Sequence, residues 1–351
     1  MKVTIHRGTH QIGGCITQIE SNSGTKIIID IGENLPSQNN QEKDEIKIKG
    51  LTYGEPEFDA VFVTHYHGDH IGLYKNINPE IPIYVGEISK EIYKIIQKKL
   101  AKSKIIPEED LQIIEKFKTF KIPERIKIKD ITVTPIEVDH SAFNAHMFLI
   151  ECDNKKILHT GDFRTHGQRG KAVFPAIEKY VGKVDCLICE GTTLSREKED
   201  IITEFDIQRK AEKIFSQNKY SFVLCSSTNI DRIAAIHKAA LKTNRLFVCD
   251  EYQKEQLMYI DKISRSGLYK FKNTVYTYGN NLLAVMKEKG FVMLVRANYL
   301  SKKVMEKFEN STFIYSQWQG YLDEKFTEYK YLQDFVPKKH IFLHTSRSCR
   351  F

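Results

Sequence analysis

Three histidines and one aspartate lie close together in the segment 64–72, which reads THYHGDHIG. His65, His67 and His70 fall within six residues, and Asp69 stands between the second and the third. Imidazole nitrogens and carboxylate oxygens are the ligands that zinc and similar divalent ions take in proteins. The segment therefore predicts a metal site, although so short a motif can also occur in a histidine-rich surface loop.

The motif follows a hydrophobic run at 60–63, which predicts a buried strand. The candidate ligands would then lie on the loop that leaves the carboxyl end of this strand. His65 and His67 would share a face if the chain stays extended, because side chains alternate along a strand with a period of two. Asp69 and His70 would lie on the turn into the next segment, from which they can reach a second ion.

Other loop-borne histidines and carboxylates can complement the motif, because one loop cannot complete two metal sites. Asp139 and His140 directly follow a predicted strand, as does Asp162, and Asp30 ends another. We expect these strand ends to meet the motif in the folded chain.

Together with the opening segment 8–15, GTHQIGGC, and the triplet 160–162, TGD, these motifs resemble the metallo-β-lactamase superfamily. They are more similar to its β-CASP branch of nucleic-acid-processing, ribonuclease J-like nucleases, and the resemblance covers nearly the whole chain. It implies an α/β fold, in which a metallo-β-lactamase αββα sandwich carries an inserted Rossmann-like β-CASP domain. The metallo core would span 1–194 and the insertion 195–338, and 339–351 would begin the return to the core.

The resemblance also implies roles for the candidate residues. One divalent ion would be held by His65, His67 and His140, the other by Asp69 and His70, with Asp162 bridging them and Asp30 orienting the ligand loop from behind. The two ions would be zinc, with manganese as the alternative. A hydroxide between them would be the nucleophile, and Asp69 could accept the proton of the attacking water.

A further acid, Glu190, opens the segment 190–193, EGTT, which resembles the start of the signature of the β-CASP branch. In the family this acid lies near the metals and supports the catalytic histidines, so we include it among the catalytic candidates with Asp69. Taken alone, Glu190 would be an ordinary carboxylate at the end of a strand.

The second half of the chain alternates predicted strands with predicted helices, which indicates a parallel sheet. Ser226, Ser227 and Thr228 lie between a strand at 221–225 and a helix at 230–241, where hydroxyls and backbone N–H groups suit a phosphate. They suit simple N-capping equally. Two arginines complete the substrate-binding candidates: Arg232, one turn into the helix, and Arg164, which follows Asp162 and could instead be only solvated.

Composition limits the function classes. Of the 351 residues 41% are hydrophobic and 28% charged, as in ordinary globular proteins, and the net charge of +8 favours a polyanionic partner such as nucleic acid. The N-terminus lacks the apolar run of a signal peptide, and no stretch is apolar enough for a membrane span. We therefore expect a cytoplasmic protein without a membrane partner. A monomer and a dimer both remain open.

The cysteines and the other histidines are not predicted to take part in the chemistry. The seven cysteines suggest no disulfide framework, and the CxxC spacing at 186–189 lies in a strand-like run, which predicts core positions. His159 is expected to point away from the neighbours of Asp162 and not to bind the metal. Five further histidines are expected at the surface or in packing contacts: His6, His10, His146, His166 and His237.

The end of the chain departs from the family. The resemblance leads us to expect a motif of the type HTSGHA and then a last metal ligand, but after His344-Thr345-Ser346 the chain reads RSCRF. The metallo core would then be truncated, with weaker binding of the second ion, lower activity and lower stability. A one-base frameshift after Ser346 would explain this tail, because suitable codons for Arg-Ser-Cys-Arg shift into Gly-His-Ala-Asp.

These inferences favour a metal-dependent ribonuclease that cleaves RNA phosphodiesters, with single-stranded RNA as its partner and impaired activity because of the truncated tail. One alternative is a hydrolase of the same fold that acts on a small ester, thioester or lactam. The other is a catalytically weak remnant that only binds nucleic acid.

Overall fold

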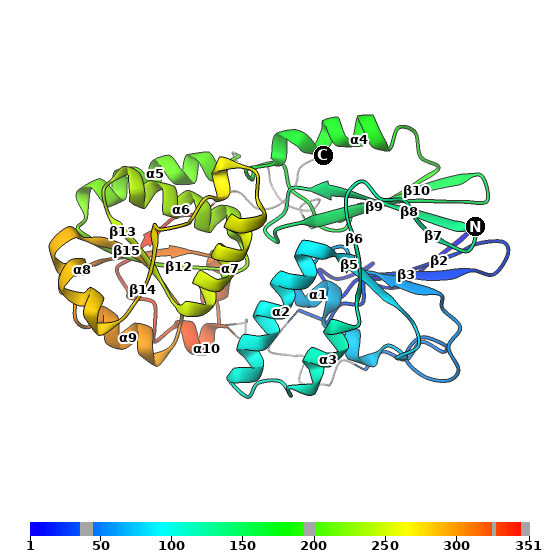
Figure 1. Cartoon of the computed structure of the whole chain (residues 1–351), viewed down its shortest axis with the longest axis horizontal. Helices are drawn as coiled ribbons and strands as arrows, with labels where there is room; N and C mark the ends of the chain where they lie inside the picture. Colours follow the sequence, from blue (N-terminus) through cyan, green and yellow to red (C-terminus); the bar gives the residue numbers. More distant parts are fainter. Residues whose placement is uncertain (36–44, 193–200, 325–327, 345–351) are drawn as a thin grey trace.

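The computed structural model describes residues 1–35, 45–192, 201–324 and 328–344. These residues form three β-sheets with helices around them. Two sheets lie together at one end of the molecule, and the third lies with its helices at the other (Figure 1). The tail 347–351 and the predicted boundary at 194 fall outside the described ranges. No helix within those ranges combines the length and the hydropathy needed to cross a bilayer.

The first sheet carries the metal-binding motif. Its strands, in order across the sheet, are β1 (Lys2–Arg7), β2 (Ile16–Glu20), β3 (Lys26–Ile29), β4 (Ala60–Phe62), β5 (Ile83–Gly86) and β6 (Lys118–Phe120). The first three are antiparallel, whereas β3 to β6 run parallel. Because β3 and β4 are parallel neighbours, Asp30 and Thr64 emerge side by side at their carboxyl ends.

The second sheet carries the other predicted ligands. Its order is β11 (Cys186–Ile188), β10 (Lys155–His159), β9 (Ala145–Cys152), β8 (Ile131–Val138) and β7 (Ile126–Ile128). Pairing is antiparallel except between β10 and β11. His140 follows β8, Asp162 follows β10, and Glu190 follows β11, so all three leave the same sheet.

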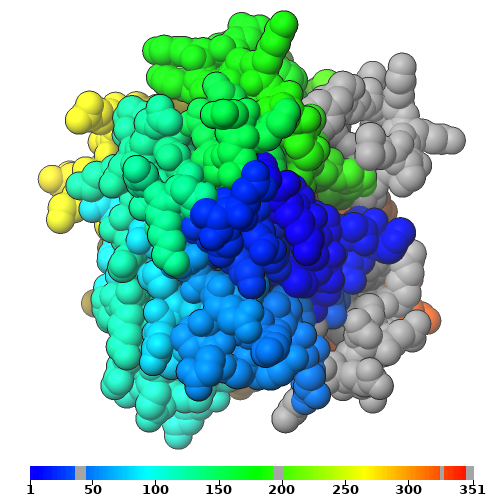
Figure 2. All heavy atoms as spheres, turned by 90° about the vertical axis from the view of Figure 1, so that its right-hand side faces the viewer, coloured from blue at the N-terminus to red at the C-terminus, as the bar shows by residue number. Residues whose placement is uncertain are grey.

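The two sheets face each other across an apolar layer. Phe62 of the first sheet meets Phe148 of the second edge to face, with ring centroids 5.8 Å apart. Figure 2 looks onto this end, where the N-terminal residues, in blue, lie next to green segments that include strands of the second sheet.

Helices cover the outer faces of both sheets. Ile92 of α2 (Glu87–Lys102) and Ile114 of α3 (Glu109–Glu115) pack in the cluster that holds Val61 and Val85. On the second sheet, α4 (Val173–Tyr180) packs in a cluster with Val138, Met147 and Leu149. The succession of helix, sheet, sheet and helix is consistent with a metallo-β-lactamase fold.

The third sheet is parallel throughout. Its order is β14 (Val275–Thr277), β13 (Leu246–Cys249), β15 (Phe291–Val295), β12 (Tyr220–Cys225), β16 (Thr312–Ser316) and β17 (Ile341–Phe342). The helices around it are α5 (Glu204–Gln217), α6 (Ile230–Lys242), α7 (Glu251–Ile263), α8 (Leu283–Lys289), α9 (Tyr299–Met305) and α10 (Tyr329–Leu332). The alternation of strands and helices predicted for this half is confirmed.

Two details differ from the predictions. Cys186 is exposed and Leu187 is 52% exposed, because β11 is an edge strand, so the prediction that the CxxC segment is core is wrong. Helix α5 was not predicted, although Thr203 and Asp206 form a capping box at its start. β17 pairs with β16, so the third sheet continues to Phe342, and the domain boundary at 338 stays a prediction.

His237, on α6, illustrates how the third sheet buries its helices. Its ring packs against Phe247 and Phe271, with centroids 5.0 Å away in each case, and its Nε2 is 2.8 Å from the Thr274 hydroxyl. Burial lowers the pKa of His237 to about 4. The packing role predicted for this histidine is therefore confirmed, and the folded state holds it neutral.

We expect His237 to make stability depend on pH. The unfolded chain takes up its proton near pH 6.5, whereas the folded chain resists protonation down to about pH 4. Its contribution is therefore fully present above pH 6.5 and is lost as pH falls toward 4. Urea unfolding at several pH values should show that acidification from pH 6.5 toward 4 lowers the free energy of unfolding less for His237→Gln than for the parent. His10→Gln, at an exposed position, should keep the parent's dependence of stability on pH. If the free energy of unfolding falls equally with pH in the parent and both variants, His237 is not the source of the dependence.

Candidate metal centre

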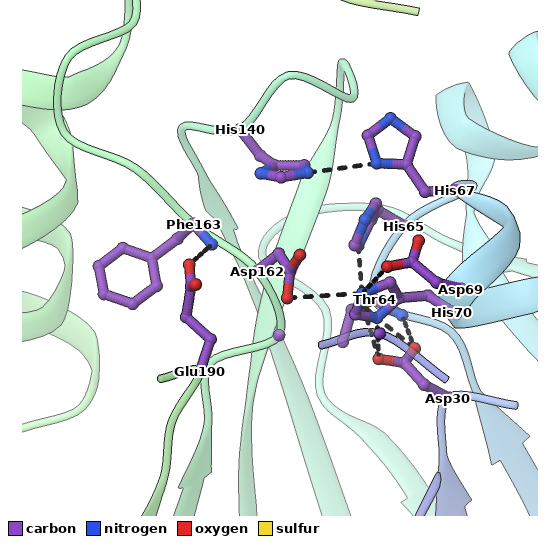
Figure 3. A network of polar contacts seen from close by, with 12 residues as sticks. Asp30, Thr64, His65, His67, Asp69, His70, His140, Asp162, Phe163 and Glu190 are labelled. Carbon is purple, nitrogen blue, oxygen red and sulfur yellow. Dashed lines mark hydrogen bonds and ion pairs between the residues drawn. The ribbon is translucent and has the colours of Figure 1, made fainter. Parts of the chain in front are cut away.

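The motif leaves β4 and turns at once into the short helix α1 (Gly68–Ile71). The N–H of His70 donates to the carbonyl of His67 at 3.0 Å, and the carbonyl of His70 accepts from the N–H of Ile31 at 2.8 Å. The turn is thereby fixed to the segment that follows β3. Extended chain before the turn and helix after it direct the imidazoles of His65 and His70 into the same space (Figure 3).

The first cluster of possible ligands joins the two sheets. One ring nitrogen from each of His65, His67 and His140 lies within 4.8 Å of the others, and Nε2 of His140 is 3.3 Å from Nδ1 of His67. Burial lowers the pKa of His65 and of His140 well below the ordinary value. Both imidazoles are thus held neutral, which is the form that binds a metal.

The second cluster shares His65 with the first. It consists of His65, His70 and Asp162, again within 4.8 Å, with Nε2 of His70 3.4 Å from Oδ1 of Asp162. Burial alone would lower the pKa of His70, but the carboxylates of Asp162 and Asp30 outweigh it and raise the pKa well above the ordinary value. The site therefore attracts positive charge between His70 and Asp162.

Unpaired nitrogens test whether a cation fits here. Among the described residues, Nε2 of His65, Nε2 of His70 and Nδ1 of His140 are buried without a hydrogen-bond partner. A buried polar atom without a partner costs about 1–3 kcal/mol. All three belong to histidines of the two clusters, and they fit metal ions, whose bonds would satisfy them.

Asp69 lies at the edge of this arrangement. Its Oδ2 is 3.8 Å from Nε2 of His70, and it belongs to neither close cluster. The structure thus brings together His65, His67, His70, His140 and Asp162, with Asp69 adjacent. The ligand and bridging roles given to them stay predictions.

Asp30 supports the centre from behind. Its buried carboxylate accepts from the N–H of Thr64 at 2.7 Å and lies 2.8 Å from Nδ1 of His70. Because Nδ1 of His70 donates to Asp30, Nε2 is left as the atom that faces Asp162. This is the orienting contact that metal-binding histidines commonly have.

A close approach at Gly32 fixes the same segment. A Cβ at this position would lie 1.6 Å from the carbonyl oxygen of Asp69 and 2.7 Å from the nitrogen of His70. The segment after Asp30 can therefore pack against α1 only if residue 32 has no side chain.

Glu190 lies on the Asp162 side of the centre. Its Oε1 accepts from the N–H of Phe163 at 3.1 Å, and burial, helped by the charge of Asp162, raises its pKa to about 7. A carboxyl group with such a pKa can exchange a proton near neutral pH.

A cavity of about 520 Å³ opens beside the second cluster. His70, Asp162 and Glu190 line one side, and the segment 7–13 with Cys15 lines the other. The opening motif at 8–15 therefore borders the site, although sequence reasoning assigned it no contact. His159 also lines the cavity, where its Nδ1 accepts from the N–H of Gly161, and it belongs to neither ligand cluster.

The predicted phosphate-binding hydroxyls lie at the carboxyl end of β12. The Oγ of Ser226 is 2.9 Å from Oγ1 of Thr228, and Ser226 is exposed, whereas Ser227 and Thr228 are half-buried. The N-cap of α6 is Asn229, whose side chain accepts from the N–H of Arg232. Because Asn229 caps the helix, the three hydroxyls are not needed for capping.

The two predicted substrate-binding arginines are placed differently. Arg164 and Arg232 are 5% and 0% exposed, and both pair with buried carboxylates. The structure therefore gives them internal contacts, and it does not present either guanidinium group to a ligand. Sequence reasoning missed this because their carboxylate partners include Glu204 and Asp231, which are remote along the chain from Arg164.

We expect Asp30→Asn to weaken metal binding about 10–100-fold, the usual range for a contact that orients a ligand. The amide can still accept from Thr64, but its NH2 group cannot accept from Nδ1 of His70. Isothermal titration with zinc would measure the loss. Asp59→Asn is the matched control, because Asp59 accepts from the N–H of Lys26 on the same sheet. Equal zinc affinity of the two variants would contradict the role of Asp30.

Comparison with known proteins places the chain in a family. The family model described as the beta-lactamase superfamily domain matches residues 25–234, which is more than half of the chain. A crystal structure of a protein of unknown function from Enterococcus faecalis V583 superposes with a TM-score of 0.75 over 99% of this chain and 88% of that one. At 21% identity this likeness shows the fold alone.

Curated relatives are distant. "Probable RNase MJ4" of Methanocaldococcus jannaschii is 25% identical over 48% of this chain and 40% of its own length. Ribonuclease J of Mycoplasma pneumoniae is 24% identical over 70% of this chain and 42% of its own length. Cleavage and polyadenylation specificity factor subunit 3 of Dictyostelium discoideum is 28% identical over 39% of this chain and 19% of its own length. The chain thus matches less than half the length of each. It belongs to the metallo-β-lactamase superfamily, and it resembles the ribonucleases of the β-CASP branch.

Proposed function

We propose that this chain is a metal-dependent hydrolase that cleaves phosphodiester bonds of single-stranded RNA. The observation that carries the proposal is the pair of ligand clusters that share His65. Membership of the superfamily and the ribonuclease names of distant relatives support the choice of reaction.

The donor set suits two divalent ions. Three imidazoles, from His65, His67 and His140, favour zinc at the first cluster, while the carboxylate of Asp162 at the second also admits manganese. When bound, the ions would make a water molecule more acidic and would hold phosphate oxygens. In this proposal Asp162 would help to hold the ions, as would Asp69 from the adjacent turn.

The protein's own groups would orient the reactants and move protons. Asp30 fixes the ring of His70, so the position of its Nε2 is set before substrate arrives. Asp69 would accept a proton from the attacking water. Glu190, with a pKa of about 7, would hold or release a proton on the Asp162 side.

The division of labour follows the three sheets. We propose that residues 1–194 form the metallo core, 195–338 a β-CASP-like inserted domain, and 339–351 the start of the return to the core, although β17 within this last segment pairs with the third sheet. In this scheme the segment 226–228, at the carboxyl end of β12, would contact RNA phosphates, because ligands of parallel sheets bind at this edge. The net charge of +8 would favour the polyanion.

The cysteines suit the proposed compartment. The six that the structure describes are all free. Free thiols persist in a reducing compartment, which supports a cytoplasmic site of action.

A small-molecule hydrolase is the second candidate. The cavity beside Asp162, at about 520 Å³, has a size typical of small-ligand pockets. It would admit a small ester, thioester or lactam next to the same ligands.

Turnover distinguishes the candidates. The zinc- or manganese-loaded chain should cleave end-labelled single-stranded RNA, and Asp162→Ala should lower the rate about 100-fold or more, because several kcal/mol of stabilisation depend on the ions. Asp334→Ala, at an exposed position, should behave as the parent. Intact RNA alongside hydrolysis of an ester, thioester or lactam panel would select the second candidate, and no turnover by the metal-loaded chain would refute both.

A further inference from the structure

The first two sheets and the third sheet meet at a cluster of buried charges, which we call the buried ionic cluster. None of its residues is more than 5% exposed. Its members are Asp139 and Arg164 from the second-sheet region and Glu204, Asp231 and Arg232 from helices α5 and α6. Taking five charged groups out of water is unfavourable unless their positions satisfy one another.

One side of the cluster leads directly to a predicted metal ligand. Asp139 immediately precedes His140, and its Oδ2 accepts from the N–H of Gly167 at 2.7 Å. A Cβ at residue 167 would lie 2.2 Å from Oδ1 of Asp139, so this contact requires glycine. The carbonyl of Asp139 accepts from the N–H of Arg164 at 2.7 Å. The loop of His140 is therefore bonded to the loop that follows Asp162.

The other side of the cluster belongs to the helices of the third sheet. Asp231 accepts from the N–H of Gln168 at 3.0 Å and from the hydroxyl of Tyr269 at 2.6 Å. Glu204 pairs with Arg232, whose Nε lies 2.8 Å from Oε2. Arg232 also donates to the hydroxyl of Ser316, at the end of β16. Arg232 thus joins parts of the third-sheet region to one another.

Arg164 differs from Arg232 because it pairs across the two regions. Its Nη2 is 2.8 Å from Oδ2 of Asp231 and its Nη1 is 3.6 Å from Oε1 of Glu204, while its Nε is 3.5 Å from Oδ1 of Asp139. Only the planar guanidinium group, with donors on three nitrogens, can reach three carboxylates at once. It is also two residues from Asp162, so one side chain ties both ligand loops to α5 and α6.

We propose that Arg164 is a positioning residue, which holds His140 and Asp162 at the metal centre in a fixed relation to the third-sheet region. The proposal rests on the metal chemistry proposed above. It explains why charged groups, rather than apolar side chains, occupy this contact. Apolar packing would hold the two regions together as firmly, but it would not fix the angle of two ligand loops through directional bonds.

The test compares two buried arginines of the same cluster. Arg164→Met removes the ion pairs of Arg164 with Glu204 and Asp231 across the two regions, whereas Arg232→Met removes contacts within the third-sheet region, and each takes one partner from Glu204. Cobalt titration of the full chain measures metal affinity, and the visible absorption of bound cobalt reports the ligand geometry. We expect Arg164→Met to weaken cobalt binding about 10–100-fold and to change the spectrum. Arg164→Lys should restore part of both.

Thermal unfolding of each variant separates positioning from loss of stability. Arg232→Met should lower the midpoint comparably, yet keep the cobalt affinity and spectrum of the parent. The proposal is overturned if Arg164→Met binds cobalt as the parent does, or if Arg232→Met changes the spectrum equally. Should the methionine variants not fold, Asp231→Asn decides, because it removes one partner charge of Arg164 at constant shape: weaker cobalt binding supports the proposal and parental binding refutes it.

Failure of the proposed function has a different signature. If the unaltered chain binds no cobalt, the metal chemistry is refuted and the positioning role with it. If the chain binds cobalt but leaves RNA intact, only the choice of substrate is refuted, and the comparison of Arg164 with Arg232 still decides the role of Arg164.

Discussion

The centre depends on one buried carboxylate, that of Asp30. It lies at the end of β3 and accepts from the N–H of Thr64 at the end of β4, so it fastens two parallel strands where they leave the sheet. The same group holds Nδ1 of His70. A carboxylate that is 0% exposed is stable only when its oxygens are satisfied by donors. The strand ends and the imidazole must therefore come together, and the direction of Nε2 of His70 follows.

The rest of the centre follows from the way in which the two sheets face each other. The first sheet supplies His65, His67 and His70 from one loop, and the second supplies His140 and Asp162 from two others. Each cluster of three possible ligands combines histidines from the first sheet with His140 or Asp162 from the second, so neither sheet forms such a cluster alone. The apolar layer between the sheets thus has a chemical consequence, because it sets the distance between loops that carry imidazole and carboxylate.

The sequence was informative wherever the signal was local. The spacing of His65, His67 and His70 within one loop, and the strand ends before His140 and Asp162, were enough to predict which side chains converge. The alternation of strands and helices after residue 200 predicted a parallel sheet for the same reason. The position of a strand at the edge of a sheet is not encoded locally. Among the described strands β11 has a neighbour on one side alone, and nothing in the run 186–189 shows this. Cys186 is therefore exposed, although the sequence predicts a core position.

Arg164 and Arg232 show that the sequence also fails to predict which partner a charged side chain has. A basic residue beside a metal motif is equally compatible with a phosphate, with solvent and with an internal ion pair, and only the positions of carboxylates distant in sequence decide among these. Arg164 meets Asp139, Glu204 and Asp231, which are 25, 40 and 67 residues away. Such pairs require both regions to be folded and in contact. The sequence therefore identifies the candidate ligands, several of which lie in one loop, but it cannot identify the residues that hold the loops of these candidates in place. Those residues depend on the contact between the two halves of the chain.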